Sequence, residues 1–507
     1  MIEIGLLIIV CLLIYHYCTA TFRYWKQRSV PFVKPTALFG NYYDVVSLKT
    51  SPAACHESIY RNFPNEKYVG MFQLRTPALL IRCPEMVKQI LVKDFNHFMD
   101  RGFHADEERE PITAHLVNLQ GEKWRMLRQK ISPVFTSGKL KAMFPLLETC
   151  SSQLSNYIES ALGEQDSSLL EMRDVMAGFT TDVIGSVAFG LHFNSFTEKE
   201  SDFQLMGRRV LDSSQTSVIT KAIRVFFPQL FHFLRLRTFP EEIATFFQTV
   251  IHDTIENREK NDVQRNDFIQ LLMQLRKKSP DYDGTEANDL EITESVIAAQ
   301  AFVFFMAGYE TSSTTLSFCL YELAKNLDVQ EKACNEIKKV LNKHGKLSHE
   351  ALMDLDYLEM ILLETMRKYP PVSVLARVCT KPYTIPGTKI SIDPGTSVAI
   401  PVYSFHHDHK YFPDPETFDP ERFSKENQEK SINYTYLPFG DGPRVCIGLR
   451  FAMLEMKLGL SDFLLRYKVS RNAQSTQKIE FDPGSFITAP RHGLKVLVER
   501  RTEDHIL

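Results

Sequence analysis

The segment with the clearest chemical potential is FGDGPRVCIG, residues 439–448, in which Cys446 follows a glycine-rich turn. Gly440 and Gly442 free the backbone before the cysteine, and Gly448 removes a side chain just after it. A long helix is expected to begin directly after Cys446, so its positive end would point at the sulfur. Backbone N–H groups and a helix N-terminus both favour thiolate over thiol. A shielded thiolate of this kind suits a haem iron that needs an electron-donating axial ligand.

Two alternatives to a haem ligand exist for this segment. One is an inert buried thiol next to a glycine-rich turn, and the other is the start of a dinucleotide-binding loop. The loop interpretation fails because Val445 stands where the third glycine belongs. The five fixed positions of F-x-x-G-x-R-x-C-x-G match by chance in on the order of one such chain in ten thousand, which favours the haem ligand.

A second segment of chemical interest lies in a long predicted helix at about 290–325, which contains the nearly all-apolar stretch Ala298–Ala307. A helix that is apolar on every side is buried on every side, so we expect it to run through the centre of the protein. Glu310 and Thr311 follow, and burying them costs free energy unless they find partners. We expect Gly308 to loosen the helix there. The alternative is that Thr311 bonds to the carbonyl four residues earlier and Glu310 points to solvent.

The overall composition is that of a globular protein. Of the 507 residues 44% are hydrophobic, and 59 basic against 62 acidic residues give a formal net charge of −3. These values exclude a largely disordered or fibrous chain and do not favour a nucleic-acid-binding protein. The nine cysteines are irregularly spaced. We therefore expect neither a disulfide framework nor a zinc site, and we place the bulk of the chain in a reducing compartment.

The amino terminus is predicted to anchor the chain in a membrane. Residues 4–20 form an apolar run of 17 residues, at the short end for a spanning helix. Basic residues follow the run, whereas a cleaved secretory signal, the alternative, carries them ahead of it. We therefore predict a transmembrane signal-anchor over 1–22 that keeps the following chain in the cytosol, with Tyr15, Tyr17 and Trp25 at the membrane–water interface. A basic, proline-containing connector, 23–35, leads to a single catalytic domain, 36–507.

The rest of the chain is predicted to be predominantly α with a smaller β part (α+β). Lys67–Leu74 and Ala78–Arg82 are short runs rich in β-forming residues near proline and glycine. Most of 120–370 has apolar residues at three- and four-residue spacing, which indicates helices. A final long helix is expected at about 447–466.

These features together resemble the cytochrome P-450 superfamily over about residues 36–500. Every fixed position of the family's haem-binding signature is present: Phe439, Gly442, Arg444, Cys446 and Gly448. Its other motifs appear in the expected order, namely Trp124-x-x-x-Arg128, AGYETS from Ala307 to Ser312, Glu364-x-x-Arg367 and Pro420-Glu421-Arg422-Phe423. The anchor resembles that of the microsomal branch, and FFMAGYETSS and RNDFIQLLMQL resemble segments of insect detoxification members.

The resemblance implies a cytochrome P-450 fold, with a large helical part around a buried haem b. Cys446 would be the axial iron ligand, and Glu310 and Thr311 would relay protons to bound dioxygen. Glu364 and Arg367 would form a buried structural network with Arg422. The other implied cofactor-binding residues, some of which would hold the haem propionates, are Trp124, Arg128, Arg377, Phe439, Gly440, Arg444 and Gly448.

The resemblance also implies a substrate pocket on the oxygen side of the haem. An aromatic lining with few charges would suit a lipophilic compound of small to moderate size. For each phenylalanine the alternative is ordinary core packing. The residues at the implied pocket positions are Phe302, Phe305, Ala307, Val372, Leu375 and Phe486.

The implied activity is that of a microsomal haem-thiolate monooxygenase in the endoplasmic reticulum membrane, with the catalytic domain facing the cytosol. It would use dioxygen to hydroxylate or epoxidise lipophilic small molecules such as plant toxins or insecticides. Because the chain has no Rossmann fingerprint, NADPH-derived electrons would come from an NADPH-cytochrome reductase, or from cytochrome b5. The alternatives are a peroxide-rearranging isomerase, a hormone or lipid hydroxylase, and a non-catalytic haem carrier.

Three surface features carry further hypotheses. The apolar segment Val225–Phe239 is expected to dip into the membrane beside the anchor. Arg450 and Lys457 are expected to meet an acidic surface of the reductase. The cluster from His406 to His409 resembles a metal site by composition, but tandem histidines cannot easily converge on one ion. We interpret it as a solvated loop.

Overall fold

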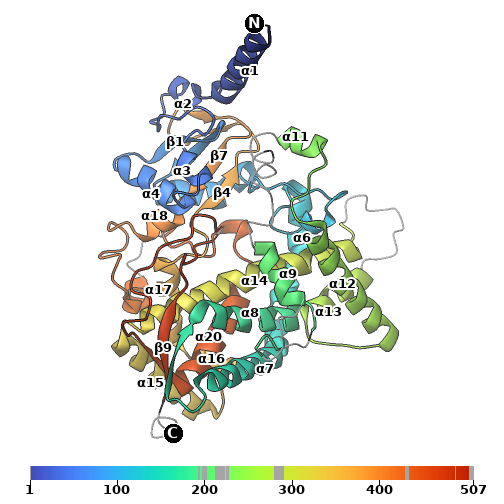
Figure 1. Ribbon diagram of the computed structural model, residues 1–507, viewed down its shortest axis with the longest axis vertical. Helices are drawn as coiled ribbons and strands as arrows, with labels where there is room; N and C mark the ends of the chain where they lie inside the picture. The colour runs from blue at the N-terminus through green and yellow to red at the C-terminus, as the bar shows by residue number, and fades with distance from the viewer. Residues whose placement is uncertain are drawn as a thin grey trace.

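The computed structural model describes residues 2–191, 194–196, 202–211, 223, 228–278, 290–428, 433–485 and 487–501. Helices make up most of the body, and a smaller sheet region lies at the end from which the N-terminal helix projects (Figure 1). The predicted α+β architecture is confirmed.

The centre of the helical part is α14, Glu294–Leu323, which packs along α8, Met172–Ala188. Within its first half, residues 297–305 are buried on every side, whereas Met306 is half-buried and Ala307 is exposed, so the prediction holds for most of the apolar stretch. The helix is continuous across Gly308, so the expected loosening is not visible as a break. Instead, a Cβ at Gly308 would lie 2.3 Å from Ile184 of α8. The glycine therefore serves the close approach of two helices.

The remaining helices surround this pair. α7, Ser137–Leu162, contacts α8, and α20, Leu449–Arg466, packs on α7 and α14. α20 confirms the predicted final helix. Other helices of the body are α4 (Pro52–Asn62), α5 (Pro84–Lys88), α6 (Gly121–Ile131), α9 (Asp202–Leu211), α11 (Pro228–Phe233), α12 (Glu241–Asn261), α13 (Phe268–Lys278), α15 (Leu327–His344), α16 (His349–Met353), α17 (Asp356–Lys368) and α18 (Val402–His406).

The β part consists of small sheets. The largest has the strand order β1-β2-β7-β4, with bounds Tyr68–Gln73, Thr76–Ile81, Ser397–Ile400 and Leu375–Val378. Its first two strands confirm the two predicted β-like runs, and β2 pairs in parallel with β7 from far along the chain. A second sheet joins β3 (Ser167–Glu171), β9 (Lys495–Arg500) and β8 (Tyr467–Ser470), and β5 (Tyr383–Thr384) pairs with β6 (Ser391–Ile392).

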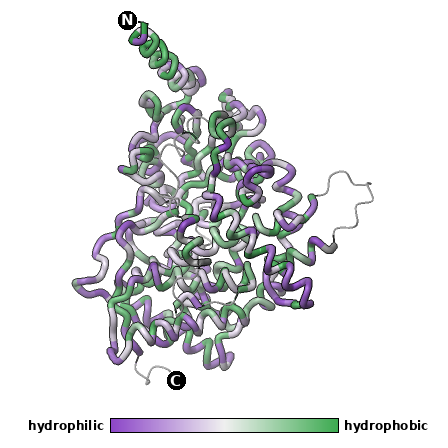
Figure 2. The backbone as a smooth tube through the Cα atoms, turned by 45° about the vertical axis from the view of Figure 1, so that its right-hand side comes forward, coloured by the Kyte–Doolittle hydropathy of each residue, from purple (hydrophilic) through white to green (hydrophobic). Residues whose placement is uncertain are grey.

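The N-terminal helix α1, Ile2–Thr19, projects from the body and is mostly hydrophobic (Figures 1 and 2). Its length and composition are sufficient to cross a membrane. The interfacial position predicted for Trp25 is wrong. This side chain is fully buried, packs over Gly70 of β1, and donates its indole N–H to the Met71 carbonyl at 2.9 Å.

Candidate active site

Cys446 sits in a tight loop between the 3₁₀ turn Gly442–Arg444 and the start of α20. Gly442 has φ +72°, and a Cβ there would lie 2.0 Å from the Leu91 carbonyl oxygen, so only glycine fits without strain. Burial raises the pKa of the Cys446 thiol, whereas the backbone N–H groups of Gly448 and Leu449 lower it. The expected arrangement of amide donors around the sulfur is therefore present.

Four arginines, Arg101, Arg128, Arg377 and Arg444, lie near this cysteine and are called the arginine ring below. Their positive charges lower one another's pKa values. Arg101 and Arg128 both lower the pKa of Cys446. Burial lowers the pKa of Arg377 to about 9, and so does the neighbouring charge of Arg101. Burial likewise lowers the pKa of Arg444 to about 9, together with Arg101 and Arg377. Among the described residues one carboxylate pairs with this group, that of Asp100, 3.7 Å from Arg444.

Several donors near Cys446 lack a protein partner among the described residues. Arg377 is 2% exposed, yet its Nε has no hydrogen bond, and its Nη1 reaches only the adjacent Ala376 carbonyl at 2.8 Å. No described hydrogen bond involves the Arg128 guanidinium or the Trp124 indole N–H. Buried cations and donors without partners cost free energy. Bound anions would relieve this cost, and arginine binds carboxylates in a bidentate fork.

Gly448 gives a second sign that the site is shaped for a bound group. Its φ is −88°, which any residue adopts. A Cβ there would meet no protein atom closer than the Phe135 ring, at 4.0 Å. The protein alone therefore leaves room for a side chain beside the sulfur. A thiolate ligand, a group of arginines of which Arg101, Arg128 and Arg377 have no ion pair among the described residues, and open space at Gly448 together fit haem b with its two propionates.

Arg444, which the resemblance implies is a cofactor-binding residue, also makes contacts within the protein. Its Nε donates to the Met99 carbonyl and its Nη2 to the Leu119 carbonyl, both at 2.8 Å. Its guanidinium also lies 4.1 Å from the centre of the Trp124 ring. Since these contacts use much of its donor capacity, Arg444 fixes the segment 99–119 to the cysteine loop.

The predicted proton pair on α14 is held by specific partners. The Thr311 hydroxyl donates to the Ala307 carbonyl at 2.6 Å, which is the back-bond considered above. Glu310 does not point freely to solvent. One of its carboxylate oxygens lies 3.2 Å from Arg173 Nη2 of α8. Burial raises the pKa of Glu310, and Arg173 lowers it.

The predicted pocket residues fall into two groups. Phe302 and Phe305 have no exposed surface and pack in a cluster of aromatic rings that includes Phe247 of α12, at 5.2 and 5.4 Å. Their rings face the helices around α14, so the structure favours the alternative of core packing for both. Ala307, in contrast, is exposed although its helix is mostly buried.

The predicted pocket residues outside α14 are less buried than Phe302 and Phe305. Val372 and Leu375 are half-buried. Leu375 lies next to the cysteine loop, because a Cβ on Gly440 would be 3.7 Å from its methyl group. Phe486 lies outside the described residues. The accessible predicted positions are thus apolar and partly adjacent to the cysteine.

The predicted network on α17 is assembled and fully buried. Arg367 donates to both oxygens of Glu364, at 2.7 and 2.9 Å, and neither side chain is exposed. Arg422 Nε lies 3.4 Å from the same carboxylate without hydrogen-bond geometry. Arg367 also donates to the His406 and Pro415 carbonyls. The Glu364–Arg367 pair therefore ties α17 to the segments that lead to the cysteine loop.

The solvated-loop interpretation of the histidine cluster is wrong for two of its members. His406 and His407 are 0% and 4% exposed. The His406 ring bridges two segments, with Nδ1 3.0 Å from the Arg367 carbonyl and Nε2 accepting the Leu437 N–H at 2.9 Å. The described residues hold no cluster suited to a metal ion. His406 therefore extends the α17 network toward the cysteine.

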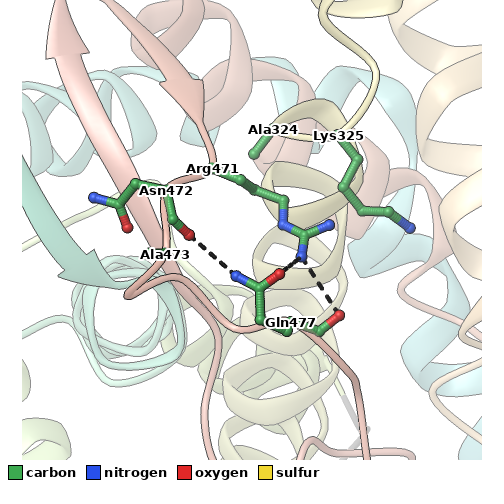
Figure 3. A pocket seen from close by; sticks show the side chains of 6 residues that line it. All are labelled: Ala324, Lys325, Arg471, Asn472, Ala473 and Gln477. Atoms are coloured by element: carbon green, nitrogen blue, oxygen red, sulfur yellow. Dashed lines mark hydrogen bonds between the residues drawn. The ribbon is translucent and has the colours of Figure 1, made fainter.

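One of the two predicted reductase contacts is not available. Lys457 is 2% exposed and pairs with Glu359 at 2.6 Å, because α20 is buried along this face. Arg450 is exposed. A surface hollow of 720 Å³ lies elsewhere, near the C-terminal end of α14, and Arg471 and Gln477 bond to each other in its wall (Figure 3). This end of α14 is roughly 25 Å along the helix from Ala307, so the hollow is not part of the site.

Arg101 and Glu455 were not singled out from the sequence. No motif marks Arg101, which donates to the Arg444 carbonyl at 3.0 Å. A sequence signal existed for Glu455, because it is an acidic residue in an otherwise apolar part of the last helix. It is completely buried, and burial raises its pKa to about 8 although the neighbouring Ser312 side chain lowers it.

Comparison with known proteins agrees with this geometry. The family model described as Cytochrome P450 matches residues 30–497. The chain is 38% identical to Cytochrome P450 6a2 of Drosophila melanogaster, over 98% of this chain and 99% of that protein. It is 37% identical to Cytochrome P450 6k1 of Blattella germanica, over 96% and 95%, and 38% identical to Cytochrome P450 6A1 of Musca domestica, over 94% of each. This chain, with a cysteine loop and arginine ring that fit haem b, belongs to the cytochrome P450 family of monooxygenases.

Proposed function

We propose that this monooxygenase is anchored in the endoplasmic reticulum membrane and oxidises lipophilic foreign compounds, such as plant toxins or insecticides. The observation that carries the substrate class is the distribution of charge in the site. The arginines gather around Cys446, whereas the accessible positions assigned to substrate, Ala307, Val372 and Leu375, are apolar. An apolar lining with few polar groups suits a lipophilic ligand.

The chain's own residues divide the catalytic work. Haem b, when bound, supplies the redox chemistry that puts one atom of dioxygen into the substrate and reduces the other to water. Cys446 would hold the iron through a sulfur that has the Gly448 and Leu449 amides beside it, and Arg101, Arg128, Arg377 and Trp124 would bind the propionates. Glu310 holds a proton at its carboxyl group, and the Thr311 hydroxyl, when released from Ala307, passes it toward the oxygen side.

A membrane orientation is supported by two apolar elements at the same end of the molecule. α1 projects there, and α11 lies at that end as well (Figure 1). On and just after α11 the large side chains Leu230, Phe233 and Leu234 are exposed by 40, 81 and 47%. An exposed apolar group of this kind, next to a hydrophobic helix, favours contact with lipid. The connector 23–35 then leads into the catalytic domain 36–507 on the cytosolic side.

The electron donor is proposed to be an NADPH-cytochrome reductase, with cytochrome b5 as a second donor. Arg450, near the start of α20, is the exposed cation proposed to meet its acidic surface. Electrostatic docking of this kind weakens with ionic strength. The rate of reduction of the full-length protein should therefore fall as salt is added.

The test is reconstitution of the full-length holoenzyme with reductase and NADPH in lipid vesicles, against a panel of lipophilic plant compounds, insecticides and steroid hormones. Several foreign compounds should give substrate difference spectra and oxidised products that depend on NADPH and reductase. Turnover of a lipid peroxide without either would instead favour the isomerase. Selective turnover of one hormone would favour the endogenous hydroxylase, and binding without turnover would favour a carrier.

Removal of residues 1–22 tests the orientation. The shortened protein should stay partly bound to vesicles through α11. A fully soluble shortened protein would contradict the contact of α11 with the membrane.

A further inference from the structure

Thr180 of α8 donates a hydrogen bond into the central helix. Its side chain has no exposed surface. The hydroxyl oxygen lies 2.9 Å from the Tyr309 carbonyl of α14 and 3.3 Å from the Ala177 carbonyl of its own helix. A hydroxyl has one proton and donates to one carbonyl at a time, so the shorter distance favours Tyr309. The bond therefore joins α8 to the peptide group between Tyr309 and Glu310.

This peptide group carries the acid of the proposed proton pair. Because a peptide is planar, its orientation sets the position of the Glu310 Cα. Thr311 follows directly, so the same turn of α14 holds both members of the pair. A contact that fixes the Tyr309 carbonyl therefore also fixes the backbone from which Glu310 and Thr311 project.

Three residues on one face of α8 meet this turn of α14. Thr180 lies seven residues after Arg173 and four before Ile184, so the three share a face of the helix. Arg173 lies 3.2 Å from the Glu310 carboxylate, and Ile184 packs where Gly308 has no side chain. Thr180, between them, bonds to the backbone. The face thus contacts both the side chain and the main chain of one turn.

Other hydroxyl groups bond to the carbonyls of this turn from within α14. These bonds run from Thr311 to Ala307 at 2.6 Å, from Ser313 to Glu310 at 3.2 Å and from Thr315 to Thr311 at 2.8 Å. Hydroxyls that bond to carbonyls of their own helix weaken its regular bonding and bend it. Donors on α14 move with the turn. Thr180 stands on a neighbouring helix, so it can hold the turn in place.

We propose that Thr180 is a positioning residue for proton delivery. Its bond to the Tyr309 carbonyl holds the backbone of the turn while the Thr311 hydroxyl leaves the carbonyl of its own helix. This inference rests on the roles of Glu310 and Thr311 proposed above. Without the Thr180 hydroxyl the turn shifts when Thr311 rotates, and the protons are misplaced. Dioxygen that has taken two electrons from the reductase and two protons then leaves as hydrogen peroxide, and the substrate is not oxidised.

The experiment uses full-length holoenzyme with reductase, NADPH and 7-ethoxycoumarin, a neutral lipophilic probe. It compares wild type with Thr180→Val, which keeps the shape of the side chain and removes the hydroxyl. Thr181→Val is the matched control, because the buried Thr181 hydroxyl bonds within α8, to the Ala177 carbonyl at 2.7 Å. Thr180→Ser restores the hydroxyl. The readouts are product and hydrogen peroxide formed per NADPH consumed, and product formed when cumene hydroperoxide replaces NADPH and reductase.

In Thr180→Val, product per NADPH should fall about two- to tenfold, as expected for loss of one neutral hydrogen bond, and hydrogen peroxide should rise in its place. Cumene hydroperoxide brings the oxygen atom and both electrons and leaves as the alcohol, so it needs no proton delivery to dioxygen. Product formed with it should match wild type, as should every readout in Thr181→Val and Thr180→Ser. An equal fall with cumene hydroperoxide, or an unchanged product per NADPH, would overturn the proposal.

Thr311→Val separates this inference from the one on which it rests. A fall in product per NADPH in Thr311→Val but not in Thr180→Val would contradict the role of Thr180 alone. No fall in either variant would contradict the proton pair as well. If Thr180→Val does not retain haem, Thr180→Ala gives the same readouts.

Discussion

The Arg173 guanidinium of α8 lies 3.2 Å from a carboxylate oxygen of Glu310 in α14. The acid of the proposed proton pair is therefore bound by a cation from the neighbouring helix. Because Gly308 lets α8 and α14 approach closely, the ion pair is part of the same helix contact. The balance between burial, which raises the pKa of Glu310, and Arg173, which lowers it, sets when the proton is available.

Replacement of Arg173 by methionine should raise the pKa of Glu310 further, because the lowering charge is lost while burial remains. The carboxyl group would then stay protonated to higher pH. The pH profile is measured as product formed per NADPH consumed. The limb of this profile that reports Glu310 should move to higher pH. Lys141→Met, which removes an exposed cation paired with Glu350, should leave the profile in place. A profile that does not move in Arg173→Met would contradict a role for Glu310 in proton delivery.

Arg101→Gln and Arg128→Gln should each weaken retention of the haem, because each removes a cation available to a propionate. Transfer of haem from the purified protein to apomyoglobin should accelerate about tenfold or more in each variant. Arg125→Gln is the control on α6, since Arg125 is paired with Glu122 and Asn96 at the surface. Equal transfer rates in all three variants and wild type would show that the arginine ring does not bind the propionates.

Glu364→Gln should prevent stable haem incorporation. The change leaves Arg367 buried next to a neutral group, and the loss of one partner of a buried pair costs about 3–5 kcal/mol. The measurements are the haem-to-protein ratio and the thermal unfolding midpoint. Glu421→Gln, at an exposed carboxylate paired with Lys332, should resemble wild type. Full haem content in Glu364→Gln would contradict the structural role of this network.

Glu455→Gln should alter the pH dependence of stability. Burial raises the pKa of Glu455 from 4.5 to about 8. Between these values the folded chain holds a proton that the unfolded chain has released. The stabilising contribution is therefore complete below pH 4.5 and is lost as pH rises through 8, by about 1.4 kcal/mol per pH unit.

The variant lacks this titration, so its thermal unfolding midpoint should rise relative to wild type between pH 5 and pH 8. Glu122→Gln, at an exposed carboxylate, should show a constant difference from wild type. A constant difference in Glu455→Gln as well would mean that Glu455 ionises normally in the folded protein.

Local patterns were sufficient to predict much of the fold. The all-apolar stretch before Ala307 indicated a buried helix, and the glycines around Cys446 indicated a tight loop at a helix start, because both depend on neighbouring residues. The pairing of β2 with β7 and the contact between Glu110 and Thr238 join distant segments. Such contacts leave no periodic signal in the sequence.

The errors share a cause, which is that residue type was used to judge exposure. Trp25 has the amphipathic side chain typical of a membrane interface, yet Gly70 provides a flat surface on which it is buried. His406 looked solvated because it is polar, but two backbone groups satisfy its ring. In each case the deciding partner lies outside the local window.

The burial of Trp25, six residues beyond the end of α1, has a mechanical consequence for the proposed anchor. A flexible tether would let the catalytic body tumble above the bilayer. Here Trp25 packs on the β1 sheet only six residues after α1 ends, so the connection between the helix and the body is short. The height and tilt of the haem site above the lipid would then depend on the packing of Trp25. Trp25→Ala would remove this packing and let the body turn relative to α1.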